Sequence, residues 1–325
     1  MIVVNHNGAR FIKGCLGALS TQVLRGGFEI VLVDNASTDG SVASVRSAFP
    51  AVRVISSPRN LGFAAGNNLG FRSARGEFLV LLNNDARPRP GWLEALVAAA
   101  DADPGLGAVT SKLVFAGRPG VIQNAGLVLR SDGGGGDRGS GEVDAGQYDA
   151  AEEVFGFCGA AALLRRSALD DVGEFDGRFF MYYEDTDLSW RMRLRGWRIL
   201  YQPAAVVEHE HAGSSREWSP FFVFHVDRNR LLMLVKCARP GLVLRSVQAV
   251  MRSVSSASRP AGGGMVAPPA RGSRPTAHRR VLRSLLWHLP GMLASRAAIR
   301  GRRRVSDRDV ELWLTPGAAQ EGGSR

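Results

Sequence analysis

Three polar residues follow directly on an apolar run at residues 78–82 that has the length and composition of a buried strand. They are Asn83, Asn84 and Asp85. In open α/β sheets, ligands bind beyond the carboxyl ends of the strands. A carboxylate flanked by amide oxygens offers hard ligands to a cation such as Mg²⁺ or Mn²⁺. We therefore predict that Asp85, assisted by Asn83, binds a cation that in turn binds a diphosphate. The alternative is a plain turn that ends the strand before Pro88.

A second acidic cluster, Glu184, Asp185 and Asp187, follows an aromatic run at residues 179–183. One carboxylate of an acidic pair beside apolar rings can have a raised pKa, which suits a general base. Asp185 is therefore predicted to take the proton from an attacking hydroxyl, with Glu184 beside it. The alternative role is capping of a helix, and a base at a helix start can do both. A cation–diphosphate site and a base together predict group transfer from an activated donor to a sugar or lipid hydroxyl.

Two histidines, His209 and His211, alternate along an extended segment and so point to the same side. One of them can add an imidazole ligand to the cation beside Asp85, because His and Asp together suit Mn²⁺. His209 is the predicted ligand. An exposed structural histidine is the favoured interpretation of His211.

Polar turns also follow the first two expected strands. Asn5 and His6 come after the first strand, and Asp34 and Asn35 come after the second. In a parallel sheet both turns lie at the carboxyl edge. Asp34 is predicted to hydrogen-bond a nucleotide base whose ring packs near the first turn. Capping of the next helix is an equally good interpretation of Asp34 and Asn35.

A glycine-rich segment at residues 60–70 follows the third expected strand. Its residues Asn60, Gly62, Gly66 and Asn67 allow close backbone approach at a helix start, which suits contact with a phosphate or a sugar. A dinucleotide-binding motif is excluded, because the spacing is not G-x-G-x-x-G and the segment does not follow the first strand.

Alternating strands and helices must position these residues. The expected strands are residues 2–4, 30–33, 52–55 and 78–82, and the expected helices are residues 11–22, 41–49, 62–73 and 92–102. This rhythm predicts a mainly parallel α/β sheet covered by helices on both faces. From 109 to 148 the pattern loosens. The later expected elements are strands at 160–164, 199–201 and 206–207 and a helix at 187–195.

The net charge of +11 in 325 residues is unevenly distributed. Residues 228–304 contain 17 Lys or Arg and no Asp or Glu, so the other residues, with 24 basic and 30 acidic side chains, have a net charge of −6. Apolar residues alternate with arginines at near-helical spacing in 231–250 and 280–304. Such segments can lie on an anionic membrane surface, and a helical cap on the rest of the protein is the alternative. Nucleic-acid binding is not expected, because no base-stacking aromatic pattern accompanies the charge.

Three widely separated cysteines match no zinc or disulfide pattern and indicate a reducing compartment. No signal peptide is expected, and no apolar run reaches the roughly 18 residues that span a bilayer. The expected location is cytoplasmic, peripheral on the inner face of the plasma membrane.

Eight segments in order and spacing resemble family 2 glycosyltransferases with the GT-A fold, in particular the bacterial rhamnosyltransferase-like group. They span roughly residues 1–230. The segments are VVNHNG (3–8), VDNASTDGS (33–41), NLGFAAGNN (60–68), LLNND (81–85), GAAALLR (159–165), VGEFD (172–176), FMYYEDTDL (180–188) and HEH (209–211).

The resemblance implies a nucleotide-sugar donor, a glycan or lipid-linked glycan acceptor, and inversion at the anomeric carbon. Asp34 falls where the family contacts the base, and Asp85 at the last acid of its metal motif. Asp185 falls at the catalytic base, and His209 at a position where relatives can supply a metal ligand. The sugar expected is L-rhamnose from dTDP-rhamnose. The alternatives are a galactofuranosyl or hexosyl group from a UDP-sugar, or a non-catalytic membrane-associated scaffold.

Three departures from the family pattern matter. Asn83 replaces the first acid of the metal motif, and His6 replaces the usual aromatic residue of the first turn. The chain also begins later than relatives do, so a start upstream of Met1 is an open alternative. The expected domains are a GT-A domain at 1–225 and a basic, partly helical and partly disordered membrane-associating tail at 226–325. Within the first, residues 1–110 bind the nucleotide sugar and residues 150–225 contribute the acceptor and base region.

Overall fold

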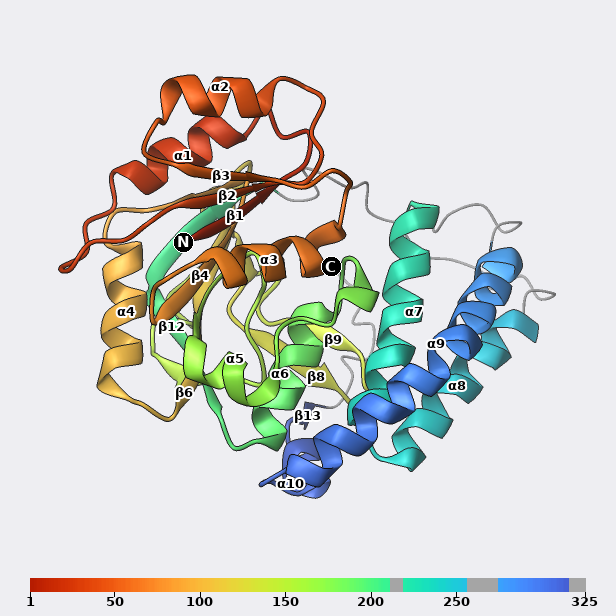
Figure 1. Ribbon diagram of the computed structural model, residues 1–325. Coiled ribbons are helices and arrows are strands. Elements are labelled where there is room, and N and C mark those ends of the chain that lie inside the picture. Colours follow the sequence, from red (N-terminus) through yellow and green to blue (C-terminus); the bar gives the residue numbers. More distant parts are fainter. Residues whose placement is uncertain (211–218, 256–273, 316–325) are drawn as a thin grey trace, which may run out of the picture.

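The computed structural model describes residues 1–210, 219–255 and 274–315. A central sheet has strands in the order β10-β12-β6-β11-β4-β1-β2-β3, with β5 added to β12 and β7 to β6 (Figure 1). The strand bounds are β1 Ile2–Asn5, β2 Val31–Asp34, β3 Arg53–Ser56, β4 Phe78–Asn83, β5 Ala86–Pro88, β6 Leu106–Phe115, β7 Ile122–Asn124, β10 Glu152–Glu153, β11 Ala161–Arg165 and β12 Arg198–His209.

Strands β1 to β4 pair in parallel, as do β6 and β12, whereas β11 lies antiparallel between β4 and β6. The predicted mainly parallel α/β sheet is therefore confirmed. The carboxyl ends of β1, β2 and β4 meet at one edge, because Asn5 pairs with Asp34 and Val4 with Asn83. The sheet register thus places the polar turns side by side.

Helices cover both faces of the sheet. Along β4, Val80 and Leu82 join the core under one set of helices, while Leu79 and Leu81 join the core under the other. This alternation follows from the two-residue period of a strand. The first set is α1 Ile12–Ser20, α2 Ser41–Ala48 and α4 Trp92–Ala102, and the second is α3 Gly62–Ser73, α5 Arg166–Val172 and α6 Glu184–Leu194.

Two strand expectations differ from the structure. β6 begins at Leu106 and is buried throughout, in a region where the sequence pattern loosens. Its polar residues are satisfied by distant partners: Trp92 Nε1 donates to Ser111 Oγ at 2.8 Å, and Lys112 pairs with Asp144 at 2.6 Å. The short strands expected at 199–201 and 206–207 form one strand, β12, with an irregularity between Gln202 and Val206.

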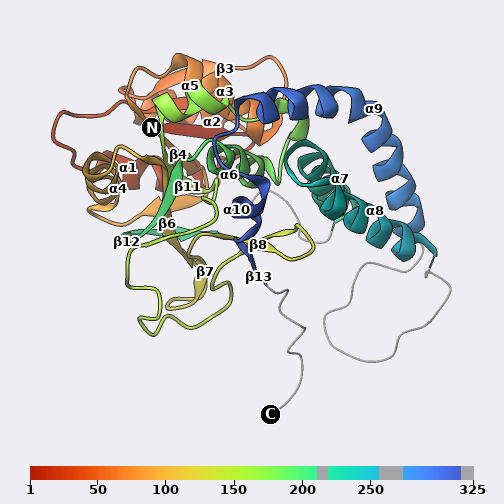
Figure 2. The same cartoon turned by 90° about the horizontal axis from the view of Figure 1, so that it is seen from below.

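A C-terminal helical layer lies beside α6 (Figures 1 and 2). It comprises α7 Pro220–Cys237, α8 Pro240–Ser255, α9 Arg274–Arg302 and α10 Asp307–Glu311, and β13 Leu314–Thr315 adds to a small sheet with β8 Leu127–Arg130 and β9 Gly135–Asp137. Trp190 and Leu194 of α6 share a core with Leu232 of α7 and Met292 of α9. The domain boundary predicted at 225/226 falls inside α7 and stays a prediction. Among the described helices, none is long and apolar enough to cross a membrane.

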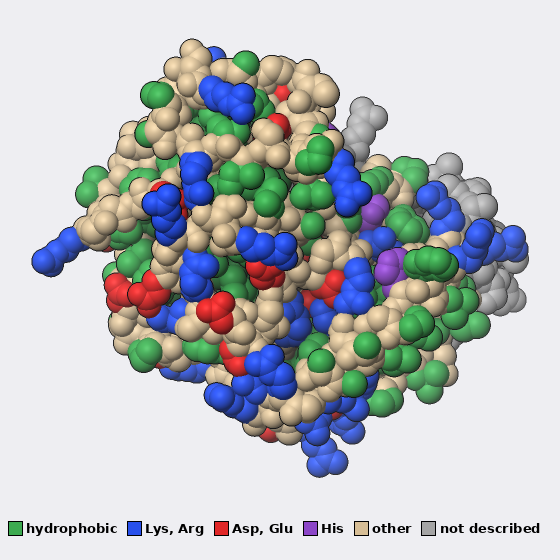
Figure 3. Space-filling model, in the orientation of Figure 1, with side chains coloured by type: hydrophobic (Ala, Val, Ile, Leu, Met, Phe, Trp, Pro, Cys, Tyr) green, Lys and Arg blue, Asp and Glu red, His purple; other side chains and the backbone are tan. Residues whose placement is uncertain are grey.

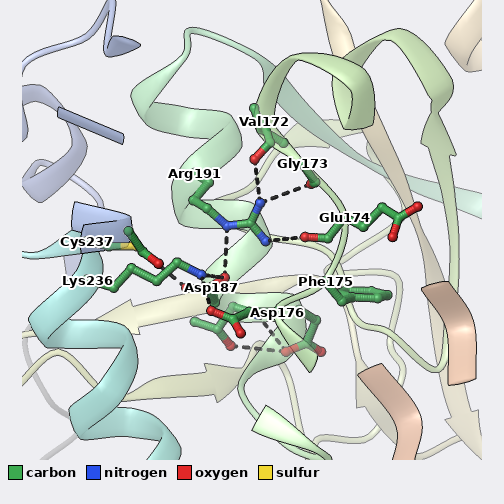
Figure 4. Close-up of polar contacts among 12 residues, drawn as sticks. Val172, Gly173, Glu174, Phe175, Asp176, Asp187, Arg191, Lys236 and Cys237 are labelled. Carbon is green, nitrogen blue, oxygen red and sulfur yellow. Dashed lines mark hydrogen bonds and ion pairs between the residues drawn. The ribbon is translucent and has the colours of Figure 1, made fainter. Parts of the chain in front are cut away.

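A buried ionic network joins α7 to α6 (Figure 4). Lys236 Nζ lies 2.9 Å from a carboxylate oxygen of both Asp187 and Asp176, and Arg191 Nε donates to Asp187 at 2.9 Å. Arg191 also donates to the carbonyl of Val172. Asp187 is 0% exposed. This aspartate of the acidic cluster is therefore engaged in joining the two helices.

Candidate active site

The turn after β4 meets the end of β12. His209 Nε2 lies 3.2 Å from Asp85 Oδ1 and 3.2 Å from Asn83 Nδ2. The other ring nitrogen, Nδ1, lies 3.0 Å from Gln123 Oε1 on β7. Because an amide oxygen can only accept, Nδ1 is the donor in that contact. In the neutral ring Nε2 then carries a lone pair, which can accept from Asn83 Nδ2 or bind a cation. The predicted grouping of Asn83, Asp85 and His209 is therefore a spatial cluster.

Asp85 Oδ1 is buried and makes no hydrogen bond, although His209 lies 3.2 Å away. A buried carboxylate oxygen without a hydrogen-bond partner is costly unless another ligand satisfies it. Within the described ranges, no group of three or more His, Cys, Asp or Glu side chains surrounds a metal position. The described residues thus offer one carboxylate, one imidazole and one amide to a cation at this position. His211 lies outside the described residues.

Asn5 connects the first strand to the turn after β4. Its Oδ1 accepts a hydrogen bond from Asn84 Nδ2 at 2.9 Å, and its Nδ2 donates to Ser41 Oγ at 2.9 Å. Both contacts are buried. Asp34 Oδ1 accepts from the Ser37 backbone N–H at 2.9 Å within the turn. The next helix, α2, has Gly40 at its N-cap position and no side-chain cap, so Asp34 does not cap it. His6 Nδ1 lies 2.8 Å from the carbonyl of Asn35.

The glycine-rich segment packs around the side chain of Asn35. Asn35 Nδ2 donates to Asn60 Oδ1 and to the Gly62 carbonyl, at 2.9 and 3.0 Å. A Cβ on Gly66 would lie 3.0 Å from Val4 Cγ1, so this glycine permits close packing of α3 on β1. Asn67 Nδ2 donates to the Phe63 carbonyl within α3.

The start of α3 is occupied by the chain itself. The Phe180 carbonyl accepts from the backbone N–H groups of Phe63 and Ala64, at 2.6 and 3.2 Å. Gly62 has φ +75°, and a Cβ there would lie 2.4 Å from Phe180 O. Glycine is required at this position because Phe180 approaches so closely. The structure thus places Phe180 where the sequence suggested phosphate or sugar contact.

Asp185 lies in the first turn of α6, partly buried. Its Oδ2 accepts from the Gly159 N–H at 3.0 Å, and its Oδ1 accepts from the Thr186 N–H at 2.7 Å. Burial raises the pKa of Asp185, and these backbone hydrogen bonds oppose the rise. Glu184 is more deeply buried, and its Oε2 has no hydrogen-bond partner. Burial, and then the charge of Asp185, raise the pKa of Glu184 well above its usual range.

The segment Gly159–Ala160 connects the two acidic positions. Its Ala160 carbonyl accepts from the Asn83 N–H at 2.8 Å, while the neighbouring Gly159 N–H donates to Asp185. Asp185 and the turn that contains Asp85 are therefore both hydrogen-bonded to the same two-residue stretch of backbone. The two thus lie near the same edge of the sheet.

Several residues at this edge escaped sequence reasoning. Gln123 orients His209, and Asp137 on β9 adds a negative charge that also raises the pKa of Asp185. Asn229 and Arg228 on α7 bind backbone carbonyls just before the base. None of them belongs to an acidic or glycine-rich motif. Asn229 stands in the polar stretch DRNR (227–230) of α7, so its sequence neighbours do not single it out.

Comparison with known proteins identifies the family. The family model "Glycosyl transferase family 2" matches residues 1–173. The pre-mycofactocin glycosyltransferase of Mycobacterium tuberculosis is 30% identical over 241 residues, covering 68% of this chain and 48% of that protein. The N-acetylglucosaminyl-diphospho-decaprenol L-rhamnosyltransferase of the same species is 29% identical over 248 residues, covering 66% and 76%. The chain thus spans about half the length of the first relative and about three quarters of the second.

A solved structure supports the same fold. The crystal structure of GalNAc-T7 with UDP, GalNAc and Mn²⁺ aligns with a TM-score of 0.61 at 13% identity, over 89% of this chain and 56% of that one. The predicted GT-A fold is confirmed. Since the family model matches more than half of the sequence and the fold agrees with it, the chain belongs to glycosyl transferase family 2.

Proposed function

We propose that the protein is an inverting glycosyltransferase that moves a sugar from a nucleotide-diphosphate donor to a glycan or lipid-linked glycan hydroxyl. The observation that supports this most directly is the stretch Gly159–Ala160, which hydrogen-bonds Asp185 on one side and Asn83 on the other. A diphosphate beside Asp85 and a hydroxyl beside Asp185 would then lie near each other at this edge of the sheet.

The proposed reaction is a single displacement. The acceptor oxygen forms a bond to the anomeric carbon while the bond from that carbon to the diphosphate oxygen breaks, and the diphosphate leaves with the electron pair. Asp185 accepts the hydroxyl proton, which its raised pKa favours. Attack on the face opposite the leaving group inverts the anomeric centre.

Asp85, His209 and Asn83 would hold a Mg²⁺ or Mn²⁺ ion at the diphosphate. The ion would neutralise charge on the leaving diphosphate. The unpartnered Asp85 Oδ1 and the lone pair of His209 Nε2 support this assignment. Asn83 in place of an acid leaves one protein carboxylate at the site, so we expect weaker cation binding in the absence of a nucleotide.

Asp34, Asn35 and the turn that contains His6 would contact the nucleotide. The donor we favour is dTDP-L-rhamnose, because the chain is similar to an L-rhamnosyltransferase over 76% of the length of that enzyme. A UDP-linked galactofuranose or hexose is the alternative, since GalNAc-T7 was solved with UDP. A thermal-shift and transfer screen with dTDP-, UDP- and GDP-sugars in the presence of Mn²⁺ separates these donors. Absence of nucleotide binding in that screen would favour a scaffold with a degenerate site.

Asp185→Asn tests the assigned base. Replacing a general base typically lowers the rate about 10²- to 10⁴-fold. We expect such a loss in transfer with unchanged affinity for the nucleotide, measured by calorimetry. Asp170→Asn, an exposed aspartate on α5, is the matched control and should transfer at the wild-type rate. Full transfer activity in Asp185→Asn would refute the role.

We also propose that α8 and α9 rest on an anionic membrane surface, which would keep the enzyme peripheral on the inner face of the plasma membrane. Leu286 and Trp287 of α9 are 68% and 84% exposed, and Arg283 lies one turn before Trp287 on the same helix. Figure 3 shows hydrophobic and basic side chains interspersed over this part of the surface. Such a combination suits the interface of an anionic bilayer.

Vesicle binding tests the membrane proposal. Vesicles containing anionic lipid should shift the Trp emission to the blue and sediment the protein, whereas neutral vesicles should not. Trp287→Ser should weaken this binding. Leu312→Ser, which removes a side chain 82% exposed outside α8 and α9, is the control for general hydrophobicity. Equal binding to neutral vesicles would refute an electrostatic contribution.

A further inference from the structure

Three residues just before the candidate base have strained backbone conformations. Phe180, Tyr182 and Tyr183 have φ values of 66°, 72° and 69°. Bulky side chains rarely adopt such values. Phe180, with ψ −61°, also lies at the centre of a three-residue turn in which the Met181 N–H donates to the Phe179 carbonyl at 2.8 Å. This form of γ-turn is rare and strained. Strain of this kind persists only where the surroundings enforce it.

Asn229 of α7 binds the strained turn directly. Its Nδ2 donates to the carbonyls of Phe179, Met181 and Tyr182 at 2.9, 2.8 and 2.7 Å, so two N–H bonds are shared among three acceptors. Asn229 is 0% exposed. Its position near the middle of an α-helix leaves the side chain no role in capping that helix.

Arg228 fixes the orientation of the Asn229 amide. Arg228 Nε donates to Asn229 Oδ1 at 2.8 Å, which directs Nδ2 toward the carbonyls. Arg228 Nη2 also donates to the carbonyls of Arg178 and Phe179 at 3.0 and 2.8 Å. Neighbouring side chains of one helix thus act on one turn.

The strained turn is held from the opposite side by α3. The Phe180 carbonyl, the one between the Asn229 acceptors, accepts from the backbone N–H groups of Phe63 and Ala64. Every carbonyl from 178 to 182 therefore has a partner from α3 or α7. Helix α6 begins at Glu184 immediately afterwards, and the next residue is Asp185.

We propose that Asn229, oriented by Arg228, is a positioning residue that holds the 179–183 turn in its strained form and so places Asp185 against the acceptor hydroxyl. The inference rests on the proposed function, because it assigns Asp185 as the base. It also gives α7 a part in the reaction that neither the acidic motifs nor the basic charge indicates. Asn229 then connects the C-terminal helical layer to the turn before the base, in addition to the Lys236–Asp187 pair between α7 and α6.

The test compares Asn229→Ala and the equal-sized Asn229→Asp with wild type. Asn229→Asp presents an oxygen in place of the amide NH₂ to the three carbonyls. Misplacing a catalytic group by about 1 Å can cost about 100-fold in rate. We therefore expect kcat to fall about 10- to 100-fold, with KM for the nucleotide sugar within about twofold of wild type. The acidic limb of the kcat–pH profile should move to lower pH, because a released turn hydrates Asp185.

Leu232→Ala, a buried α7 substitution in the core beside α6, is the control for loss of stability. It should lower the melting temperature and leave the pH profile in place. If Asn229→Ala does not fold, Asn229→Asp and Arg228→Lys supply the same comparison, since lysine lacks the planar fork that binds several carbonyls. Wild-type kcat and pH profile in the folded Asn229 variants would overturn the proposal.

Hydrogen exchange separates this inference from the proposed function. Faster exchange confined to the amides of residues 181–187 in the Asn229 variants would support the proposal that Asn229 holds the turn, even if wild-type protein transferred no sugar. Unchanged exchange there would overturn it. Absence of transfer by wild type with every donor would count against the proposed function alone.

Discussion

His209 Nε2 lies 3.2 Å from Asp85 Oδ1, and the opposite nitrogen of the ring contacts Gln123 Oε1 at 3.0 Å. One imidazole at the end of β12 thereby contacts both the turn after β4 and strand β7. The contact with Gln123 selects the tautomer in which Nε2 can act as a ligand. A site with this arrangement depends on Gln123 although Gln123 itself need not touch the cation.

Three variants should therefore lose cation-dependent nucleotide binding to different extents. Asp85→Asn should abolish the effect of Mn²⁺ on binding of a nucleoside diphosphate, and His209→Ala should weaken it. Gln123→Leu should weaken it about 10-fold, as expected for loss of an orienting partner. Calorimetry with Mn²⁺ and with EDTA measures the difference. Asp101→Asn, exposed on α4, is the control, and equal Mn²⁺ dependence in all variants would contradict the assignment.

Transfer should increase with pH through the raised pKa of Asp185. A base acts only when it is deprotonated, and burial raises the pKa of Asp185 above the usual aspartate range. The acidic limb of kcat/KM should therefore lie at higher pH than that of an ordinary aspartate. Rates measured across the acidic range at saturating cation will show the limb. A rate independent of pH down to the normal aspartate pKa would be the contrary result.

Glu184→Gln should stabilise the protein, and more so as the pH rises. Because the folded-state pKa of Glu184 is raised, the folded protein binds this proton more tightly than the unfolded chain does. The favourable contribution of Glu184 to the free energy of unfolding is complete below its unfolded pKa and is lost as the pH rises through the folded value. Glutamine avoids this loss. The melting temperature of Glu184→Gln should exceed that of wild type by more at about pH 8 than at about pH 5, because a carboxyl with a raised pKa destabilises the folded protein as the pH rises.

The control for that experiment is Glu94→Gln, which changes an exposed carboxylate on α4. Its melting temperature should follow that of wild type at both pH values. If Glu184→Gln instead raised the melting temperature by the same amount at both pH values, the raised pKa of Glu184 would be ruled out.

Lys236→Met should destabilise the protein, although Lys236 makes no contact with Asp85 or His209 at the sheet edge. Removing one member of a buried ion pair typically costs 3–5 kcal/mol, and we expect about 3 kcal/mol here because Asp187 retains Arg191 and Asp176 retains Arg178. Urea unfolding measures the change. Arg239→Ala removes an exposed ion pair with Glu311 and should cost less than about 1 kcal/mol. Equal losses in the two variants would show that the network contributes no more than a surface pair.

Local patterns in the sequence were sufficient for the N-terminal half of the fold. The apolar run of β4 and the polar residues after it predicted both a buried strand and a site at its end, because strand burial and sheet-edge chemistry are each encoded within a few residues. The pattern failed for β6, where Thr110, Ser111 and Lys112 interrupt the apolar run. Those side chains are tolerated inside only because Cys158, Trp92 and Asp144 contact them.

The sequence by itself determined which chemistry the chain can offer: a carboxylate after a buried strand, a second one after aromatic residues, and a histidine on an extended segment. Only the tertiary structure decided that Asp187 joins α6 to Lys236 while its neighbour Asp185 faces Gly159. It also decided that Asn229 restrains the turn before Asp185. The physical reason is that such roles depend on hydrogen bonds between residues far apart in the chain, and no local period or motif records those partners.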